Sequence, residues 1–210
     1  MKPVRHLPDS VESKMLARIR WAGPGAVFVP GDFLADGNRQ AVDFVLHRLV
    51  KRGELRRLTR GLYDYPKSHP QLGLLAPSVE AIAGALAGRD KLRLQPSAAY
   101  AANLLHLSEQ VPAKAAFLTD GPSRRINIGA REIVLKRTTP KAMAAAGRMS
   151  GLIIQALKHL GRPHVTMERI APLRKLLSGR DRKQLEQDTA LAPAWMTPFL
   201  QAIAAGEETP

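Results

Sequence analysis

Hydrophobic residues near the start of the chain recur, in two segments, at the three- and four-residue spacing of an amphipathic α-helix. In the first segment, Asp9 or Ser10 is a suitable N-cap, and the apolar repeat continues to about Trp21, before a Gly-Pro-Gly turn. The second segment covers residues 39–51, and Gly53 follows it where a C-cap glycine belongs. The pattern therefore predicts two helices, each with one buried face.

Short apolar runs lie between and after these two helices. Residues 26–29 are typical of a strand, and residues 32–35 of a short helix that ends in a turn. Two extended runs, 54–59 and 62–65, are separated by Arg60-Gly61 and predict a β-hairpin, although the first run alternates poorly and leaves the register open. This order of elements is typical of a winged helix-turn-helix, in which the second helix of the motif enters the major groove of DNA.

The second half of the chain alternates helical and strand-like segments. The predicted elements are helices at 78–86 and 97–107, strands at 91–94, 115–119, 124–128 and 131–136, and helices at 139–161, 166–177, 181–191 and 193–204. Turn sequences separate the last three strands, which favours antiparallel pairing. We therefore predict an α+β protein: an N-terminal winged helix-turn-helix followed by a mixed α+β domain with a small antiparallel sheet and a helical C-terminal part.

Proline and glycine mark the expected domain boundary. Pro66, Pro70, Gly73 and Pro77 fall in a stretch with little that could pack as regular structure, so this stretch is predicted to be a hinge. The expected organisation is a winged helix-turn-helix domain at 1–66, a linker at 67–77, an α+β effector domain at 78–205 and a frayed tail at 206–210.

Charge is the strongest global feature of the 210-residue sequence. Its 32 lysines and arginines against 18 aspartates and glutamates give a formal net charge of +14, which favours polyanionic partners, usually nucleic acid. The excess is spread along the chain and is locally dense only between Arg39 and Arg60. The sequence holds no cysteine, no signal-like N-terminus and no apolar run long enough to cross a membrane, so we expect a cytoplasmic protein without disulfides or thiolate metal sites.

The predicted DNA-binding domain offers specific contacts to DNA. The candidate DNA-binding residues are Asn38, Arg39, Gln40, Asp43, His47 and Lys51 on the second helix and Arg56, Arg57, Arg60 and Gly61 on the wing. The residues at the start of the helix can bond base edges, whereas the wing arginines suit phosphates and the glycine allows a tight turn. Asp43 accepts from a cytosine amino group, orients an arginine or pairs with His47. Winged helices also serve as protein-interaction modules, but fold, arginine density and net charge together favour DNA.

The sequence contains no recognisable catalytic motif. Metalloprotease, phosphate-loop and dinucleotide-binding signatures are absent, and the histidines show no spacing suited to a metal. A nuclease would need carboxylates and a lysine on adjacent strands to hold magnesium; Glu132 and Lys136 could share one strand face close to Asp120, but a turn sequence already explains Asp120. We therefore predict a protein that is not an enzyme and needs no metal or cofactor.

A second set of polar residues lies in the predicted effector domain. Its members are Ser97, Tyr100, Asn103, Thr119, Asp120, Ser123, Arg124 and Arg125. Capping, turn formation and solvation account for most of them. The alternative is a contact surface for a toxin, an RNA or a second DNA segment, and the adjacent arginines Arg124 and Arg125 are its first candidates.

Four stretches carry a family resemblance. Residues 29–34 (VPGDFL) and 41–66, with the wing sequence Arg-Gly-Leu-Tyr at 60–63, resemble the N-terminal domain of AbiEi-type antitoxins of type IV toxin–antitoxin systems. Residues 94–114 and 118–125 are similar to the second domain of an uncharacterised subfamily of these proteins. The resemblance covers most of the chain, from about residue 10 to residue 200.

The resemblance implies a function for each domain. Family members repress their own operon through the winged helix, and the other domain counters a nucleotidyltransferase-like toxin without forming a stable complex with it. We therefore expect a transcriptional autorepressor and antitoxin, monomeric in solution, that pairs on inverted repeats of its operator in double-stranded DNA. Two alternatives stay open: a C-terminal domain that binds the toxin directly, and a metabolite-responsive repressor, which would need an apolar pocket.

Overall fold

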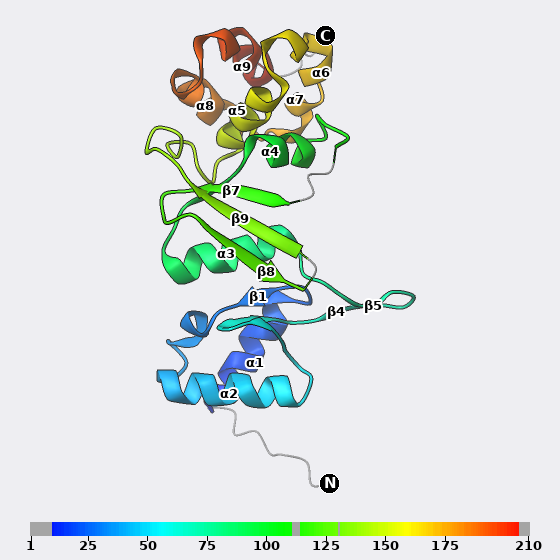
Figure 1. Cartoon of the computed structure of the whole chain (residues 1–210), viewed down its shortest axis with the longest axis vertical. Helices are drawn as coiled ribbons and strands as arrows, with labels where there is room; N and C mark the ends of the chain where they lie inside the picture. The colour runs from blue at the N-terminus through cyan, green and yellow to red at the C-terminus, as the bar shows by residue number, and fades with distance from the viewer. Residues whose placement is uncertain (1–9, 111–113, 130, 206–210) are drawn as a thin grey trace. The chain divides into compact units, whose positions relative to one another are not determined.

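The computed structural model describes residues 10–110, 114–129 and 131–205, and their contacts divide them into two units that separate after Lys91. Both units combine helices with strands, so the α+β class predicted from the sequence is confirmed (Figure 1). Within the described ranges, no helix combines the length and the apolar character needed to span a membrane.

Unit 1 contains the elements predicted before residue 66, in the predicted order. Its elements are α1 (Val11–Ala22), β1 (Val27–Phe28), the 3-10 helix η1 (Pro30–Phe33), α2 (Arg39–Lys51), β2 (Arg56–Thr59), β3 (Leu62–Asp64), β4 (Lys67–His69), β5 (Gly73–Leu75) and α3 (Val79–Asp90). The Ser10 hydroxyl accepts a hydrogen bond from the Ser13 amide at the start of α1, and Asn38 Oδ1 accepts one from the Ala41 amide at the start of α2. These caps fix both helix starts where the sequence predicts them.

The core of unit 1 lies between α1, η1 and the inner face of α2. Its buried residues are Met15, Leu16, Ile19, Phe28, Phe33, Val42, Val45, Leu46, Leu49 and Leu55. The rings of Phe28 and Phe33 pack with their centroids 5.5 Å apart. Because this packing uses one side of α2, the opposite side of the helix faces outward.

The three-stranded sheet of unit 1 has the order β1-β3-β2 and is antiparallel throughout. The register between β2 and β3 shifts between Arg57 and Thr59, in agreement with the poor alternation of this run in the sequence. Gly61 has φ +70° at the turn, a conformation that favours glycine.

Residues 67–77, predicted as a linker, form a hairpin of β4 and β5 instead. Arg56 Nη2 donates a hydrogen bond to the carbonyl oxygen of Leu75 at 2.8 Å, which ties the hairpin to β2. Helix α3, which the sequence analysis assigns to the second domain, groups with unit 1. The division between the units thus falls after Lys91 and not in the predicted linker. Turn-forming prolines and glycines occur in hairpins as well as in linkers, so they did not mark the domain boundary.

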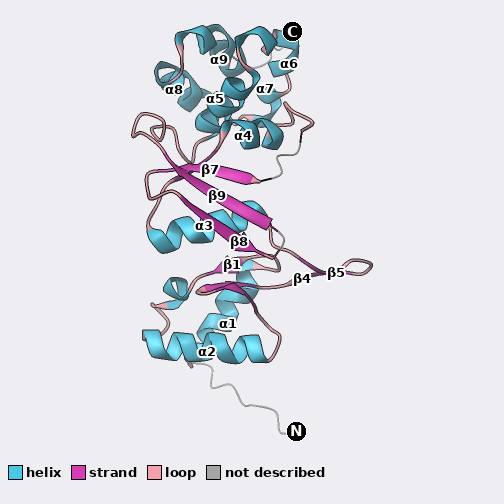
Figure 2. Ribbon diagram, in the orientation of Figure 1, coloured by secondary structure: helices cyan, strands magenta, loops and turns pink. Residues whose placement is uncertain are grey.

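Unit 2 combines a sheet with several helices. Its elements are β6 (Leu94–Pro96), α4 (Ala98–Leu104), β7 (Ala115–Thr119), β8 (Arg124–Ile128), β9 (Arg131–Arg137), α5 (Met149–Leu160), η2 (Arg162–His164), α6 (Met167–Ile170), α7 (Leu173–Leu176), α8 (Gly179–Asp188), η3 (Thr189–Leu191), η4 (Ala194–Met196) and α9 (Thr197–Ala204). Figure 2 shows α4 to α9 gathered on one side of the sheet. The tail predicted to fray, 206–210, lies outside the described residues.

The sheet of unit 2 has the order β6-β7-β9-β8 and is mixed, so the predicted antiparallel sheet is wrong in one pairing. β8 and β9 form the expected antiparallel hairpin, but β9 then pairs in parallel with β7. Turn sequences predict only pairs of strands that follow one another, whereas a parallel pair depends on contacts between distant segments.

The helical part of unit 2 packs around α5. Helix α5 begins at Met149, later than the predicted start at Thr139, because residues 140–147 form turns. Gly151 is fully enclosed there: a Cβ atom would overlap the carbonyl oxygen of Ala145 and crowd Oε1 of Gln95. Glycine usually weakens the interior of a helix, but at this position the packing requires it.

Candidate nucleic-acid interface

The outward face of α2 is the first component of the candidate site. Its side chains are Gln40, Phe44, His47 and Lys51, all exposed, and they lie opposite the buried Val42, Val45, Leu46 and Leu49. The sequence analysis finds three of these four but misses Phe44, which is 61% exposed. At about 100° per residue, Phe44 lies about 40° from Gln40 and about 20° from Lys51 around the helix, so angular spacing was the signal that could have found it.

The start of α2 holds two of the predicted base-contacting residues in defined positions. Asn38 uses its side-chain oxygen to cap the helix. Arg39 Nε donates to Asp43 Oδ2 at 2.8 Å, and both side chains remain substantially exposed. Of the alternatives that the sequence leaves open for Asp43, the structure has the one in which it orients an arginine.

Two arginines of the segment between Arg39 and Arg60, Arg48 and Arg52, form ion pairs with a residue of α1. The carboxylate of Glu12, which is 5% exposed, accepts from Arg48 Nη2 at 2.7 Å and from Arg52 Nη2 at 2.6 Å. The hydrogen bond to Glu12 is the main cause of a raised pKa for Arg52, with a further contribution from Glu54. These ion pairs join α2 to α1, so the two arginines have a structural role.

Arg56, predicted as a phosphate contact, is also structural. Its Nη2 and Nε lie 2.6 and 3.0 Å from the two oxygens of Asp64, a carboxylate that is fully buried. This hydrogen-bonded pairing raises the pKa of Arg56. Three of the five N–H donors of this guanidinium are thus bonded to Asp64 and to the Leu75 carbonyl, which gives Arg56 a structural role, and its contact with phosphate stays a prediction.

Arg57 and Arg60 remain as cations of the predicted wing. Arg57 follows Arg56 on β2 and therefore points to the other face of the sheet. Both side chains are exposed, and within the described residues neither forms an ion pair. With Gly61 at the turn between β2 and β3, this hairpin presents two positive charges next to a tight turn.

The polar set of unit 2 resolves mostly into turn-forming and packing contacts. The buried Thr119 hydroxyl accepts from the Gly121 amide, and Ser123 Oγ accepts from the Arg137 amide. Asp120 accepts from the side chain and the amide of Arg93, and these two hydrogen bonds lower the pKa of the Asp120 carboxyl. These residues stabilise the connection between β7 and β8.

Three further members of that set lie at the start of α4 and within it, and each makes a different local contact. Ser97 occupies the N-cap position of α4 without a side-chain capping bond. The Tyr100 ring packs edge-on against Phe117, with centroids 5.4 Å apart. Asn103 Nδ2 donates to the carbonyl oxygen of Gln110. The three side chains therefore serve different local contacts.

Arg124 and Arg125 do not form a paired cationic site. They are neighbours on β8, paired with Leu135 and Val134 of β9, so their side chains lie on opposite faces of the sheet. Arg125 is the exposed one, 3.6 Å from Glu132. Glu132 bonds mainly to Lys114, and this bond lowers the pKa of the Glu132 carboxyl.

Two of the residues that the sequence analysis weighs as nuclease-like, Asp120 and Glu132, form ion pairs in the structure. Asp120 is bonded to Arg93, and Glu132 is bonded to Lys114. In the part of the chain that the structure describes, no group of three or more histidine and acidic side chains could hold a metal ion.

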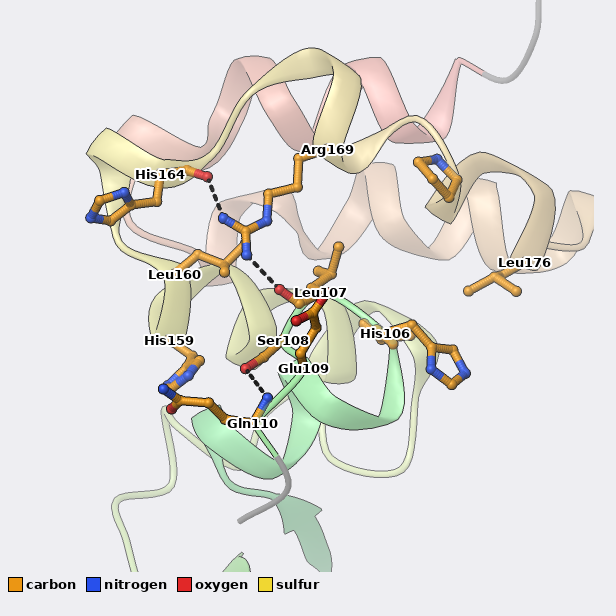
Figure 3. A pocket seen from close by; sticks show the side chains of 12 residues that line it. His106, Leu107, Ser108, Glu109, Gln110, His159, Leu160, His164, Arg169 and Leu176 are labelled. Carbon is orange, nitrogen blue, oxygen red and sulfur yellow. Dashed lines mark hydrogen bonds between the residues drawn. The ribbon is translucent and has the colours of Figure 1, made fainter.

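A cavity of about 820 Å³ in unit 2 lies beside the loop that follows α4 (Figure 3). Arg169 Nη2 donates to the carbonyl oxygen of Leu107 at 2.7 Å, and its Nη1 donates to that of His164 at 3.3 Å. In Figure 3 the rings of His106 and His164 point to opposite sides of the pocket, away from the guanidinium. The polar groups do not converge on one point, so Arg169 is explained by tying this loop to η2 and α6.

Comparison with known proteins places the chain in a family but assigns no activity. Residues 14–185 match a family of unknown function, DUF6088. No curated protein matches the chain. Among solved structures, the chain is similar to the RV2827C protein from Mycobacterium tuberculosis, with 15% sequence identity, coverage of 95% of this chain and 82% of that one, and a TM-score of 0.42. Because the family match covers most of its length, the chain belongs to the family of unknown function DUF6088.

Proposed function

We propose that this protein binds double-stranded DNA through unit 1, with α2 in the major groove and the turn between β2 and β3 against the phosphate backbone. The observation that carries the proposal is the outward face of α2, which is rich in groups that bond base edges and is left unused by the core. An α-helix fits the major groove, where each base pair presents a distinct pattern of donors and acceptors.

The charges of unit 1 support this orientation. Arg39 is held by Asp43 at the start of α2, where a helix-turn-helix contacts bases. Lys51 at the other end of the helix and Arg57 and Arg60 on the hairpin are exposed cations suited to phosphates. In a winged helix-turn-helix, α2 would be the recognition helix and β2–β3 the wing.

The biological role that we propose follows from the resemblance to AbiEi-type antitoxins. The protein would be a cytoplasmic, non-enzymatic repressor of its own operon that counters a nucleotidyltransferase-like toxin. Its operator would consist of inverted repeats, because one winged helix contacts only a short half-site and specific repression needs two copies.

The test of DNA binding is a titration of the full chain with the duplex upstream of its own gene and with a random duplex of equal length. We expect tighter binding to the upstream duplex, and a log–log salt slope that falls by about 0.9 for each phosphate contact removed. Arg60→Gln should lower that slope, whereas Arg162→Gln, which removes an exposed arginine of unit 2, should not.

The result that would end the proposal is equal affinity for both duplexes together with an Arg60→Gln slope equal to that of the wild type. The antitoxin role is tested separately: it requires a nucleotidyltransferase-like reading frame beside the gene, and growth of cells that express its product with and without this chain measures protection. A stable complex of the two proteins in gel filtration would favour the alternative in which the C-terminal domain binds the toxin directly.

A further inference from the structure

Phe44 is an aromatic side chain on a surface where the sequence analysis expects only polar groups. It lies on the outward face of α2, one helical turn after Gln40 and beside His47. A single exposed apolar side chain is common on protein surfaces, so exposure by itself carries no argument. Two other features of Phe44 do indicate a function: it lies on the face of α2 that is proposed to enter DNA, and its ring is held in place by neighbouring side chains.

The Phe44 ring is held in place by a chain of contacts that leads into the protein. The guanidinium of Arg48 lies over the ring, with its central carbon 5.7 Å from the ring centroid. Arg48 is in turn bonded to the buried carboxylate of Glu12 on α1 at 2.7 Å. An exposed ring fixed in this way loses less conformational freedom when it binds a partner.

We propose that Phe44 contacts the C5-methyl group of a thymine in the major groove and thereby contributes to sequence specificity. The inference rests on the proposed function, since it requires α2 to enter the groove. Base edges in the major groove present hydrogen-bonding groups, and the thymine methyl is the one apolar group among them. A phenyl ring gains free energy from burial against that methyl, whereas a phosphate offers it no apolar surface to bury.

The spacing on α2 also limits where this thymine can lie. Gln40 has the donor and acceptor pattern that suits adenine, and it precedes Phe44 by four residues, which is about 6 Å along the helix axis. Successive base pairs are about 3.4 Å apart, so a helix lying along the groove places the thymine about two base pairs from the Gln40 contact.

The experiment removes only the methyl group. Duplexes bound by the full chain are selected from a random pool, and each dT of the selected sequence is then replaced singly by dU, which keeps the pairing edge. At one thymine per half-site, dU should weaken wild-type binding by about fourfold, the value of one buried methyl group. Phe44→Ala should bind the dT and dU duplexes equally, and Phe44→Leu should keep part of the difference.

A matched control is available in the same unit. Trp21 is an even more exposed aromatic residue, 91% exposed on α1, and Trp21→Ala should keep the full dT-to-dU ratio. Phe44→Leu also guards against misfolding, because an exposed leucine is well tolerated in a helix. Circular dichroism of each variant checks that the helical content is retained.

The outcomes separate this inference from the proposed function. Specific binding with every dU replacement neutral, or with a Phe44→Ala ratio equal to that of the wild type, would overturn the role of Phe44 and leave DNA binding intact. Loss of self-association in Phe44→Ala, with the methyl effect unchanged, would assign the ring to a protein contact. If no duplex is selected from the pool, the proposed function fails and the inference fails with it.

Discussion

Arg56 and Arg57 are adjacent arginines for which the structure predicts opposite consequences of the same substitution. Arg56 forms two hydrogen bonds to the buried carboxylate of Asp64 and one to the Leu75 carbonyl oxygen. Arg57 points to the other face of the sheet and forms no ion pair within the described residues. Arg56→Gln should therefore destabilise unit 1, and Arg57→Gln should weaken DNA binding without changing stability.

The size of the stability loss follows from the burial of the pair. Removing one partner of a fully buried ion pair costs about 3–5 kcal/mol, whereas an exposed pair contributes about 0–1 kcal/mol. The Asp64 side chain is 1% exposed and that of Arg56 is 33% exposed, so solvent screens part of the pair. We expect Arg56→Gln to cost about 2–3 kcal/mol and Arg57→Gln to stay within about 0.5 kcal/mol of the wild type.

Hydrogen exchange measured by mass spectrometry is suited to this prediction, because it reports the stability of each unit separately. In Arg56→Gln, the peptides of α2, β2 and β3 should exchange about 30- to 150-fold faster, which is the expected free energy converted at about 1.4 kcal/mol per decade. Peptides of α5 and α9 in unit 2 serve as the internal control. Equal exchange in the two variants, or a larger effect in Arg57→Gln, would refute the structural role of Arg56.

Two further predictions concern packing and pH. Gly151→Ala should destabilise unit 2 by about 1–3 kcal/mol and lower its melting temperature. Gly84→Ala should stabilise unit 1 by about 0.5–1 kcal/mol, because the new methyl group meets open space on α3. Melting temperatures that shift in the same direction in both variants would contradict this. Because Arg93 lowers the pKa of Asp120, the stabilisation from this carboxylate is present above its unfolded-state pKa and is lost as the pH falls through the lowered value. Asp120→Asn should therefore lose less stability than the wild type on acidification. Melting temperatures of the two proteins that fall in parallel as the pH is lowered would refute this role of Asp120.

The elements of unit 1 before residue 66 could be predicted from the sequence because local chemistry determines them. The Asn38 cap, the apolar repeat of α2 and the glycine at the hairpin turn each act within a few residues. The mixed sheet and the unit boundary could not be predicted in the same way. The pairing of β7 with β9 depends on contacts between segments that are distant in the sequence, and so does the grouping of α3 with unit 1. Turn and capping patterns report only local structure and do not predict such contacts.

The candidate site could be predicted only in part, because local patterns identify its outward-facing residues but not its ion pairs between distant segments. Helical spacing identifies Gln40, His47 and Lys51 as outward, and the structure agrees. Helical spacing does not reveal that Arg56 pairs with Asp64, which is buried in β3. In the sequence of a hairpin, a charged residue that forms a buried ion pair cannot be distinguished from one that is exposed to solvent. Phe44 was overlooked because an apolar residue in an amphipathic helix is expected on the buried face.

These pairings also change what the positive charge of unit 1 implies for DNA binding. Of the seven basic residues between Arg39 and Arg60 that make this segment dense, Arg39, Arg48, Arg52 and Arg56 form ion pairs, which leaves Lys51, Arg57 and Arg60 without one in the described structure. Three phosphate contacts release counterions with a log–log salt slope of about 2.7 per protomer, whereas seven would give about 6. Arg39 could leave its exposed pair with Asp43 at low cost, which adds at most one contact. A measured slope near 3 per bound protomer would therefore mean that the segment binds DNA with its pairings intact, and a slope near 6 would mean that other basic residues of the chain contribute.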